Sequence, residues 1–499
     1  MLKRRGHCRS RIVATLGPAT SSPRALARLI RAGVDVVRLN FSHGTHAEHR
    51  ALYHAVRKAA AERKACVAVM ADLGGPKLRL GRLQDDEVLL KRGARVDVVE
   101  EPGLGTVERL TVEAEGVVAG LTKGRSIRLR DGLVELIVEK RVPGGVRCRV
   151  THGGAVRSRQ GVNLPGALGH LRAFTAKDRK DLAFALDLGV DAVAVSFVRD
   201  GDDLRAVRRF CKRRHRDPFL VAKIERAEAV ESLDDIIAAC DGVMVARGDL
   251  GVEIGVHRVP MEQKRILRAA RLAQRPTITA TQMLESMVEN ASATRAEVSD
   301  VANAVLDGTD ALMLSAETAV GQHPVAAVET LVRVAREVEL AALDLLPRDE
   351  LAAPEGGTDE LPLACSRAAR VAAQACGAAA LMAFSNSGRT VRLVSSQRPR
   401  RPIFGATHRE ETWRRMRFYW GVRPMLIRHA PRVSLMIAEA EQLLRDHRLV
   451  PKGARIVVVC GESVVSGATN SVKIHVMGET DGVETARRAA AAQARGARK

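Results

Sequence analysis

The stretch FLVAKIERAEAVESLDDIIAACDGVMVARGDLG, residues 219–251, decides the fold class. Two short apolar runs, Phe219–Ile224 and Gly242–Ala246, flank an amphipathic stretch at Ala227–Cys240, an order typical of parallel strands joined by a crossover helix. The same order recurs along most of the chain. It predicts further strands at Arg11–Leu16, Val34–Asn40, Cys66–Ala71, Ala192–Ser196, Pro276–Ala280 and Ala311–Leu314. It predicts further helices at Pro23–Arg31, Ala47–Glu62, Pro260–Ala273, Arg295–Leu306 and Pro324–Leu340. Eight such units favour an α/β fold with a closed (β/α)₈ TIM barrel.

One interval breaks this rhythm. Residues 80–157 lack long helical patterns and consist of short strand-like runs separated by glycines, which predicts a small inserted β-barrel domain. Removing it leaves 1–79 and 158–345, a length close to the roughly 250 residues of a typical (β/α)₈ barrel. Residues 346–357 read as a linker, 346–478 contain a C-terminal α/β domain, and 479–499 form a basic tail.

The chain is strongly basic, with 80 Lys and Arg against 58 Asp and Glu and a net charge of +22. This charge fits a nucleic-acid-binding protein or an enzyme of anionic substrates, but the excess is spread along the chain, which favours a solvated surface. Trp413 and Trp420 stand among arginines in HREETWRRMRFYWGVRPML (408–426). Such interleaving can stack on single-stranded nucleic acid, although core packing is the expected role. We therefore expect no nucleic-acid partner.

No uncharged apolar run is long enough to span a bilayer, and the first residues lack the apolar segment of a secretory signal. We expect no membrane association. The eight cysteines form no C-x-x-C pair, and several stand inside apolar runs. This usage predicts a reduced, cytoplasmic protein with buried thiols.

Polar side chains gather at the predicted strand ends, where such barrels carry their chemistry. Arg38, Asn40 and Ser42 in RLNFSHG (38–44) share one face of an extended chain. In MADLGGPKLRLG (70–81), two glycines and a proline impose a turn that is followed by Lys77 and Arg79. These groups suit phosphate or cation positioning, although the second stretch alone is equally compatible with a surface turn.

Lys223 and Glu225 are two residues apart at the end of an apolar strand, so they share a face. A structural ion pair is one interpretation, and a catalytic pair is the other. Gly248 and Asp249 follow the next strand, where free N–H groups can hold an anion. Glu225 and Asp249 together suit Mg²⁺, which takes one or two carboxylates plus substrate oxygens.

Hydroxyls and a carboxylate complete the set: Thr279 and Thr281 at one strand end, and Ser315 and Glu317 at the next. Ser315 and Glu317 taken alone are more typical of a helix cap. The combined strand ends predict Mg²⁺-assisted phosphoryl transfer on a phosphorylated anion.

These motifs resemble the pyruvate kinase family in order and over essentially the whole chain. The resemblance rests on IVATLGPATSS (12–22), VVRLNFSHG (36–44), DLGGPKLR (72–79), GVNLPG (161–166), KIE (223–225), VARGDLGVEI (245–254), ATQMLESM (280–287), TRAEVSDVANAVLDG (294–308) and SGATNSVKIHV (466–476). It implies transfer of the phosphoryl group of phosphoenolpyruvate to ADP, giving pyruvate and ATP in the last step of glycolysis.

The resemblance also implies roles for individual residues. It makes Lys223, Arg38, Thr281 and Arg79 catalytic, and it assigns Mg²⁺, or Mn²⁺ as a substitute, to Glu225 and Asp249. It places the substrate at Gly248, Asp249, Thr281 and Ser196, the nucleotide at Arg38, Asn40, His43 and Arg79, and a monovalent cation at Asn40, Ser42, Asp72 and Leu73. The inserted domain would be a mobile lid that closes over the nucleotide and excludes water.

Some residues depart from the usual family pattern. Lys77, together with Leu73, resembles the K⁺-independent subgroup, because an ammonium can supply the single positive charge that K⁺ would bring. Gln160 stands where many members have a lysine that reaches toward the nucleotide, which leaves that contact open.

The resemblance further implies allosteric regulation and a homotetramer. A phosphorylated effector would bind FSNSGRT (384–390), whose small and hydroxyl residues before a helix can form an anion nest, although a plain turn is the alternative. The expected ligands are Ser385, Asn386, Ser387, Gly388, Arg389 and Thr390. The second effector loop, CGESVV (460–465), is short.

Overall fold

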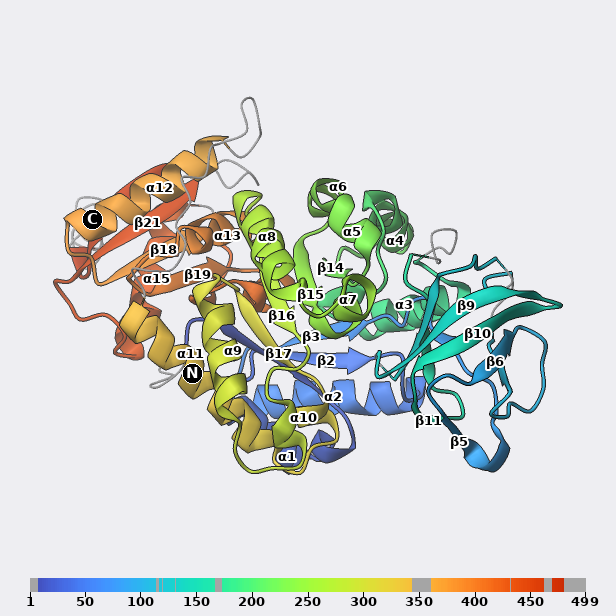
Figure 1. Cartoon of the computed structure of the whole chain (residues 1–499). Coiled ribbons are helices and arrows are strands. Elements are labelled where there is room, and N and C mark those ends of the chain that lie inside the picture. The colour runs from blue at the N-terminus through green and yellow to red at the C-terminus, as the bar shows by residue number, and fades with distance from the viewer. Residues whose placement is uncertain are drawn as a thin grey trace, which may run out of the picture. The chain divides into compact units, whose positions relative to one another are not determined.

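The computed structural model describes residues 8–113, 116–118, 120–130, 132–166, 173–342, 360–430, 432–461 and 469–479 (Figure 1). The expected linker at 346–357, residues 462–465 of the second effector loop and the tail beyond 479 lie outside the described residues. The chain divides into two compact units. The first comprises Met1–Arg38, His49–Met70 and Met283–Lys499, and the second comprises Leu39–Glu48 and Ala71–Gln282.

Eight parallel strands form a closed barrel in the order β1-β17-β16-β15-β14-β13-β3-β2, which confirms the predicted fold class. The strands are β1 (Arg11–Thr15), β2 (Val36–Asn40), β3 (Ala68–Asp72), β13 (Ala192–Val195), β14 (Phe219–Ile224), β15 (Gly242–Ala246), β16 (Thr277–Ala280) and β17 (Ala311–Leu314). Nearly every strand residue is buried, as expected where both faces of a parallel strand are covered. This two-sided burial is why these strands read as continuous apolar runs.

The barrel strands alternate with helices, as predicted. The helices are α1 (Pro23–Ala32), α2 (His46–Glu62), α3 (Ala176–Leu188), α4 (Gly201–Arg213), α5 (Ala227–Glu231), α6 (Leu233–Ala239), α7 (Arg247–Ile254), α8 (Val259–Leu272), α9 (Arg295–Leu306), α10 (Ala316–Ala319) and α11 (Pro324–Ala342), with 3₁₀ turns at η1 (Pro18–Thr20) and η3 (Glu285–Val288). The single helix expected over Ala227–Cys240 is wrong: Ser232, with φ −96° and ψ 23°, separates α5 from α6. No helix among the described residues is long and apolar enough to cross a membrane.

The segment between β3 and β13 carries the inserted β domain. Its strands are β4 (Leu78–Arg79), β5 (Glu87–Leu90), β6 (Arg95–Val99), β7 (Arg109–Thr111), β8 (Ser126–Leu129), β9 (Val134–Val142), β10 (Gly145–His152), β11 (Gly154–Arg157) and β12 (Gly161–Asn163), with a 3₁₀ turn at η2 (Gln84–Asp86). Seven of them form one sheet in the order β4-β12-β8-β9-β10-β6-β7. A bridge between Leu80 and Val112 joins its two edges, so the sheet curls around its own apolar core.

The C-terminal α/β domain holds a five-stranded sheet in the order β20-β19-β18-β21-β22, with β22 antiparallel to β21. Its elements are α12 (Glu360–Ala375), β18 (Ala380–Phe384), α13 (Arg389–Ser396), β19 (Ile403–Thr407), α14 (Glu410–Arg415), η4 (Met416–Phe418), β20 (Val422–Leu426), α15 (Val433–Asp446), β21 (Arg455–Gly461) and β22 (Thr469–Val476). Sequence reasoning missed β20 because Pro424 interrupts it. A proline is tolerated there because β20 is an edge strand.

Candidate active site

Lys223 and Glu225 stand at the carboxyl end of β14, inside the second compact unit. Lys223 Nζ lies 2.7 Å from Ser196 Oγ, 2.8 Å from Glu225 Oε1 and 3.3 Å from Asp72 Oδ1. The Lys223 side chain is 9% exposed, and both carboxylates are 1% exposed. Three neighbouring strand ends therefore converge on one buried ammonium group, which satisfies the pairing that a buried charge requires.

Ser196, directly after β13, links this lysine to the end of β3. Its hydroxyl donates to the carbonyl of Leu73 at 2.7 Å, while the Leu73 N–H donates to the carbonyl of Ala194 at 3.0 Å. Ser196 was expected to contact substrate, and in this structure it also holds Lys223 against β3. The backbone around Leu73 is consequently fixed by β13 and by Ser196 directly after it.

One carboxylate oxygen of Glu225 binds the backbone, and the other contacts Lys223. Oε2 accepts a hydrogen bond from the N–H of Phe197 at 2.7 Å, and Phe197 adopts a φ of +55°. Oε1 is buried and has no hydrogen-bond partner apart from its ionic contact with Lys223. Burial raises the pKa of the Glu225 carboxyl, Lys223 lowers it, and the nearby charge of Asp249 raises it further.

This carboxylate oxygen and Asp249 fit a divalent cation. A buried oxygen without a hydrogen bond, close to a second carboxylate, is the donor set that Mg²⁺ accepts when substrate oxygens supply its other ligands. The described residues contain no cluster of three or more His, Cys, Asp or Glu side chains with metal-binding spacing.

Thr281, after β16, is held against the first turn of α7. The N–H of Gly248 donates to Thr281 Oγ1 at 2.8 Å, and the Thr281 hydroxyl donates to the carbonyl of Ala280 at 2.6 Å. Gly248 and Asp249, whose N–H groups are expected to be free for an anion, lie in the first turn of helix α7, and the N–H of Gly248 already has a partner. A helix N-terminus of this kind favours a negative charge.

Arg247 fixes the backbone that carries Thr281. Its guanidinium donates to the carbonyl of Thr281 at 2.8 Å and to that of Gln282 at 3.1 Å. Both of these residues have left-handed backbones, with φ of +67° and +52°. Such backbones persist only where the surroundings hold them, so Arg247 is a positioning residue.

The loop after β3 approaches the same site. Gly75 has a φ of +65°, and a Cβ there would lie 2.8 Å from Phe197 Cδ2, so this position requires glycine. Its N–H donates to Asp178 Oδ1 at 3.1 Å. Lys77 follows, and its side chain is partly exposed to solvent. Desolvation lowers the pKa of Lys77, the charge of Lys223 lowers it further, and Asp249, Glu225 and Asp72 raise it.

The other residues with expected roles are distributed around β2 and β4. Asn40 Oδ1 accepts from the N–H of Ser42 at 3.2 Å, and the N–H of His43 donates to the carbonyl of Asn40 at 3.2 Å. Arg79 donates to the carbonyl of Arg159 at 3.0 Å. Arg38, the last residue of its segment in the first compact unit, donates to Thr15 Oγ1 at 3.1 Å.

Glu317 is a structural cap. Its carboxylate accepts from the N–H of Leu284 at 3.1 Å and from that of Ser315 at 2.7 Å, and the side chain is buried. The helix-cap interpretation is wrong for the Ser315 side chain, because Ser315 is the N-cap residue of α10 but its hydroxyl makes no capping hydrogen bond; the Glu317 carboxylate binds the Ser315 N–H instead.

The loop 385–390 in the C-terminal domain leads into α13. Ser385 Oγ accepts from the N–H of Gly388 at 2.9 Å, and Gly388 caps the helix with a φ of +90°. Thr390 Oγ1 lies 2.6 Å from Thr469 Oγ1. Hydroxyls and the N–H groups of a helix terminus therefore meet in this loop.

Helix α7 also contacts the inserted domain, within the same compact unit. Arg128 of β8 donates to the carbonyl of Val252, and the N–H of Gly166 donates to Glu253 Oε2 at 3.4 Å. Arg128 is itself paired with Glu135 at 3.0 Å. Sequence reasoning missed these contacts, as it missed Arg247 and Phe197, because they use backbone atoms. The charged Arg247 directly after an apolar strand was a signal that could have been used.

Comparisons with known proteins show the family of this chain. Residues 7–328 match the family model "Pyruvate kinase, barrel domain", and residues 363–475 match "Pyruvate kinase, alpha/beta domain". "Pyruvate kinase" of Agrobacterium vitis is 40% identical over 485 residues, covering 97% of this chain and 99% of the relative. "Pyruvate kinase 2" of Synechocystis sp. is 40% identical over 474 residues (94% and 79%), and "Pyruvate kinase" of Mycobacterium intracellulare is 40% identical over 474 residues (95% and 99%). The chain belongs to the pyruvate kinase family.

Proposed function

We propose that this chain transfers the phosphoryl group of phosphoenolpyruvate to ADP and releases pyruvate and ATP. The observation that carries the proposal is the buried ammonium of Lys223, held between Ser196, Asp72 and Glu225 at the carboxyl end of a barrel strand. A fixed cation in a poorly solvated site stabilises negative charge that develops during a reaction. In this role Lys223 faces the transferring phosphoryl group and the enolate oxygen.

Thr281 and the first turn of α7 bind the substrate carboxylate in this proposal. The helix terminus at Gly248 and Asp249 favours an anion, and the Thr281 hydroxyl already contacts the N–H of Gly248. After phosphoryl transfer the enolate carbon must gain a proton. In this proposal Thr281 orients the water that delivers this proton, and the hydrogen bond from Arg247 to the Thr281 carbonyl keeps the threonine in position.

Glu225 and Asp249 would hold Mg²⁺, with Mn²⁺ as a substitute. Mg²⁺ in such a site neutralises phosphoryl charge and aligns the reacting oxygens. Arg38, Asn40, His43 and Arg79 are the proposed nucleotide contacts. Gln160 cannot supply a cation at the nucleotide. Arg79 lies near Gln160, because it donates a hydrogen bond to the carbonyl of the preceding residue, Arg159.

The proposed enzyme does not require K⁺. Its monovalent-cation site would comprise Asn40, Ser42, Asp72 and Leu73, with the ammonium of Lys77 in place of the metal ion. The electrostatic influence of Lys223, Asp249, Glu225 and Asp72 on the pKa of Lys77 supports this role, because it puts Lys77 within the field of the reacting groups. The ammonium group of Lys77 is not a metal ligand, unlike the oxygen atoms of the proposed cation site. It can therefore replace K⁺ only by supplying a positive charge.

Regulation by a phosphorylated effector at residues 385–390 and assembly into a homotetramer are further parts of the proposal. The hydroxyl and N–H groups of the loop support phosphate binding. A reducing, cytoplasmic location is supported by the eight cysteines, all of which lie among the described residues as free thiols.

Pyruvate formation from phosphoenolpyruvate and ADP with Mg²⁺ tests the function directly. We expect turnover in the wild type and its loss in Lys223→Met, with Lys264→Met on the surface of the barrel domain as the matched control. A folded wild-type protein that forms no pyruvate, with phosphate effectors present, would contradict the proposed function.

A further inference from the structure

The loop 41–45, between β2 and α2, carries two residues that have roles in the proposed reaction. Ser42 belongs to the proposed monovalent-cation site, and His43 is a proposed nucleotide contact. The N–H of Ser42 donates to Asn40 Oδ1 and the N–H of His43 donates to the Asn40 carbonyl, both at 3.2 Å. These two hydrogen bonds lie within the loop and its own strand. Other contacts must therefore fix the loop against its neighbours.

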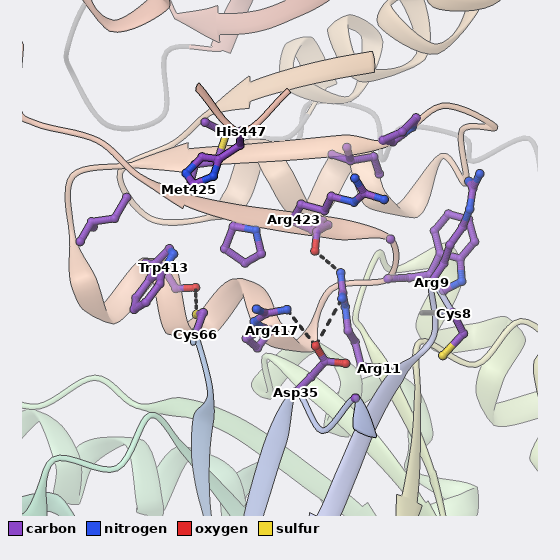
Figure 2. Close-up of a pocket in the computed structure, with 18 of the residues that line it drawn as sticks. Cys8, Arg9, Arg11, Asp35, Cys66, Trp413, Arg417, Arg423, Met425 and His447 are labelled. Carbon is purple, nitrogen blue, oxygen red and sulfur yellow. Dashed lines mark hydrogen bonds and ion pairs between the residues drawn. The ribbon is translucent and has the colours of Figure 1, made fainter. Parts of the chain in front are cut away.

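The strand that leads into this loop is held at both ends. Asp35, the residue before β2, has its Oδ1 2.8 Å from Arg417 Nη1 and 3.6 Å from Arg11 Nη1 (Figure 2). At the other end of the strand, the N–H of Phe41 donates to the carbonyl of Asp72 on β3 at 2.9 Å. These contacts keep the strand in register, so the loop starts from a defined point.

Two residues one turn apart on α3 hold the loop at its two ends. Lys177 Nζ donates to the carbonyl of Phe41 at 2.8 Å. Asp181 Oδ1 lies 2.8 Å from Nε2 of His46, the first residue of α2. Lys177 and Asp181 are themselves joined, with Nζ 2.6 Å from Asp181 Oδ2. We call this ion pair the α3 clamp; all four residues belong to the second compact unit.

Aromatic packing supports the same arrangement. The ring of His46 stacks on that of Phe184 on α3, with centroids 4.1 Å apart and planes 4° apart. The ring of Phe41 meets Phe184 edge-on, with centroids 6.2 Å apart. Phe184 thus lies between the two ends of the loop, and the clamp residues add directed polar contacts to this packing.

The two clamp residues differ in burial. The Asp181 side chain is 7% exposed, whereas that of Lys177 is 64% exposed. An exposed ion pair contributes little to the stability of a protein, since it is solvated and costs side-chain freedom. Lys177 can therefore be replaced without unfolding the protein, and what its replacement changes is the contact with the Phe41 carbonyl.

The same turn of α3 also holds the loop after β3. The buried carboxylate of Asp178 accepts the N–H of Gly75 at 3.1 Å through Oδ1, while Oδ2 accepts the N–H of Thr175 at 2.9 Å. The two loops are close to each other, because a Cβ on Gly74 would lie 3.3 Å from Ser42 Oγ. Neighbouring residues of one helical turn therefore hold two adjacent loops of the candidate active site.

We propose, on the basis of the function proposed above, that Lys177 is a positioning residue for nucleotide binding. Together with Asp181 it fixes the loop 41–45, so that His43 is held where the nucleotide binds. Lys177 acts through the Phe41 carbonyl and not by touching a substrate. The substrate carboxylate has its proposed site on α7, so the α3 clamp should affect ADP and leave phosphoenolpyruvate unaffected.

Three variants of the full-length protein test this role. Lys177→Met removes the ammonium and keeps the apolar stem, and Lys177→Arg keeps a donor for the carbonyl. Lys180→Met removes an exposed lysine three positions further along α3 and is the matched control. Lys177→Met should raise KM for ADP roughly tenfold or more and change KM for phosphoenolpyruvate by less than about twofold. Lys177→Arg should restore most of the affinity for ADP, and Lys180→Met should behave as the wild type does.

Two further measurements do not depend on turnover. Calorimetric titration with ADP and Mg²⁺ should show a roughly tenfold weaker Kd in Lys177→Met than in the wild type. Hydrogen exchange in a peptide that covers the loop 41–45 should be about tenfold faster in this variant, with a melting temperature within about 2 °C of the wild type. A wild type that forms no pyruvate would contradict the proposed function, while these two measurements would still decide the role of Lys177.

Four results would overturn the role of Lys177. The first two are an unchanged affinity for ADP in Lys177→Met and unchanged hydrogen exchange in the loop 41–45. The third is an equal rise in the KM values of both substrates, which would indicate a general loss of structure. The fourth is the same weakening in Lys180→Met, which would indicate an effect of surface charge.

Discussion

Lys223 Nζ lies 2.8 Å from Glu225 Oε1, and the two side chains are only 9% and 1% exposed. Removing the ammonium leaves Glu225 and Asp72 buried without their cation, and it removes the fixed charge that we propose for stabilising the transferring phosphoryl group. We expect Lys223→Met to lower kcat by roughly a thousandfold or more and to lower the melting temperature while the protein still folds. Coupled pyruvate assays and thermal denaturation measure both effects. Near-normal turnover in this variant would refute the role of Lys223.

Thr281 offers a test by nearly isosteric replacement. Its Oγ1 accepts the N–H of Gly248 at 2.8 Å. Thr281→Val keeps the shape and removes the hydroxyl, so kcat should fall roughly 10- to 100-fold, while Thr281→Ser should retain most of the activity. Equal kcat values for these two variants would show that the hydroxyl has no part in the reaction.

Arg247 should act through Thr281. Arg247→Met removes the hydrogen bonds to the carbonyls of Thr281 and Gln282, so the left-handed backbone of both residues loses its support. We expect kcat to fall more than KM rises, with little further loss when Thr281→Val is added. Additive losses in the double variant would mean that Arg247 acts independently.

Lys77 should determine the response to K⁺. The wild type should turn over equally in K⁺-free buffer and in about 100 mM KCl, since the lysine already supplies the charge. Lys77→Glu reverses that charge and should make activity depend on K⁺. Steady-state assays in Na⁺ and in tetramethylammonium control for ionic strength. A wild type that is inactive without K⁺ and is rescued by it would exclude this role of Lys77.

The loop 385–390 should lose effector binding when its backbone is altered. Gly388 has a φ of +90°, and a Cβ there would lie 3.2 Å from the hydroxyl of Tyr419. Gly388→Ala should therefore strain the helix cap and weaken activation by a sugar phosphate, tested with glucose 6-phosphate and fructose 1,6-bisphosphate. Basal turnover should not change. Unaltered activation by whichever sugar phosphate activates the wild type would argue against this site.

The buried thiols should resist alkylation at pH 8. Burial raises the pKa of Cys148 and Cys240 to about 12 and that of Cys211 to about 11. Because the thiolate is the reactive form and these pKa values lie well above 8, only a very small fraction is ionised. Mass spectrometry after iodoacetamide treatment should find Cys365 and Cys376 modified and these three thiols intact. All eight should react in guanidinium chloride.

The barrel was predictable because parallel strands buried on both faces leave continuous apolar runs in the sequence. The strand expected at Arg11–Leu16 is found at Arg11–Thr15, and the one expected at Phe219–Ile224 has those bounds. The predicted helix boundaries were wrong where tertiary packing overrode the local sequence pattern, as at Ser232 between α5 and α6. The edge strand β20 was missed because Pro424 argues against a strand when neighbours are unknown.

The candidate site was predictable where the side chain itself carries the chemistry. Lys223 and Glu225 could be recognised in the sequence because they are two charged residues, two positions apart, at the end of an apolar strand. The N–H of Phe197, by contrast, binds Glu225 through an atom that every residue except proline has, so the residue type gives no signal. Arg247 acts on carbonyl groups that lie more than 30 positions away in the sequence, a relationship that only the folded chain reveals.

Helix α7 has only eight residues, yet both of its ends are engaged. The first turn carries Gly248 and Asp249, and the following turn offers the Val252 carbonyl to Arg128 of the inserted domain. At 1.5 Å per residue the two ends of α7 are about 12 Å apart. We expect so short a helix to move as a rigid unit. A movement of the inserted domain, which we propose as the lid over the nucleotide, must therefore either break the contact between Arg128 and the Val252 carbonyl or tilt α7. If α7 tilts, the position of Gly248 and Asp249, the proposed binding site for the substrate carboxylate, would depend on whether the inserted domain is open or closed.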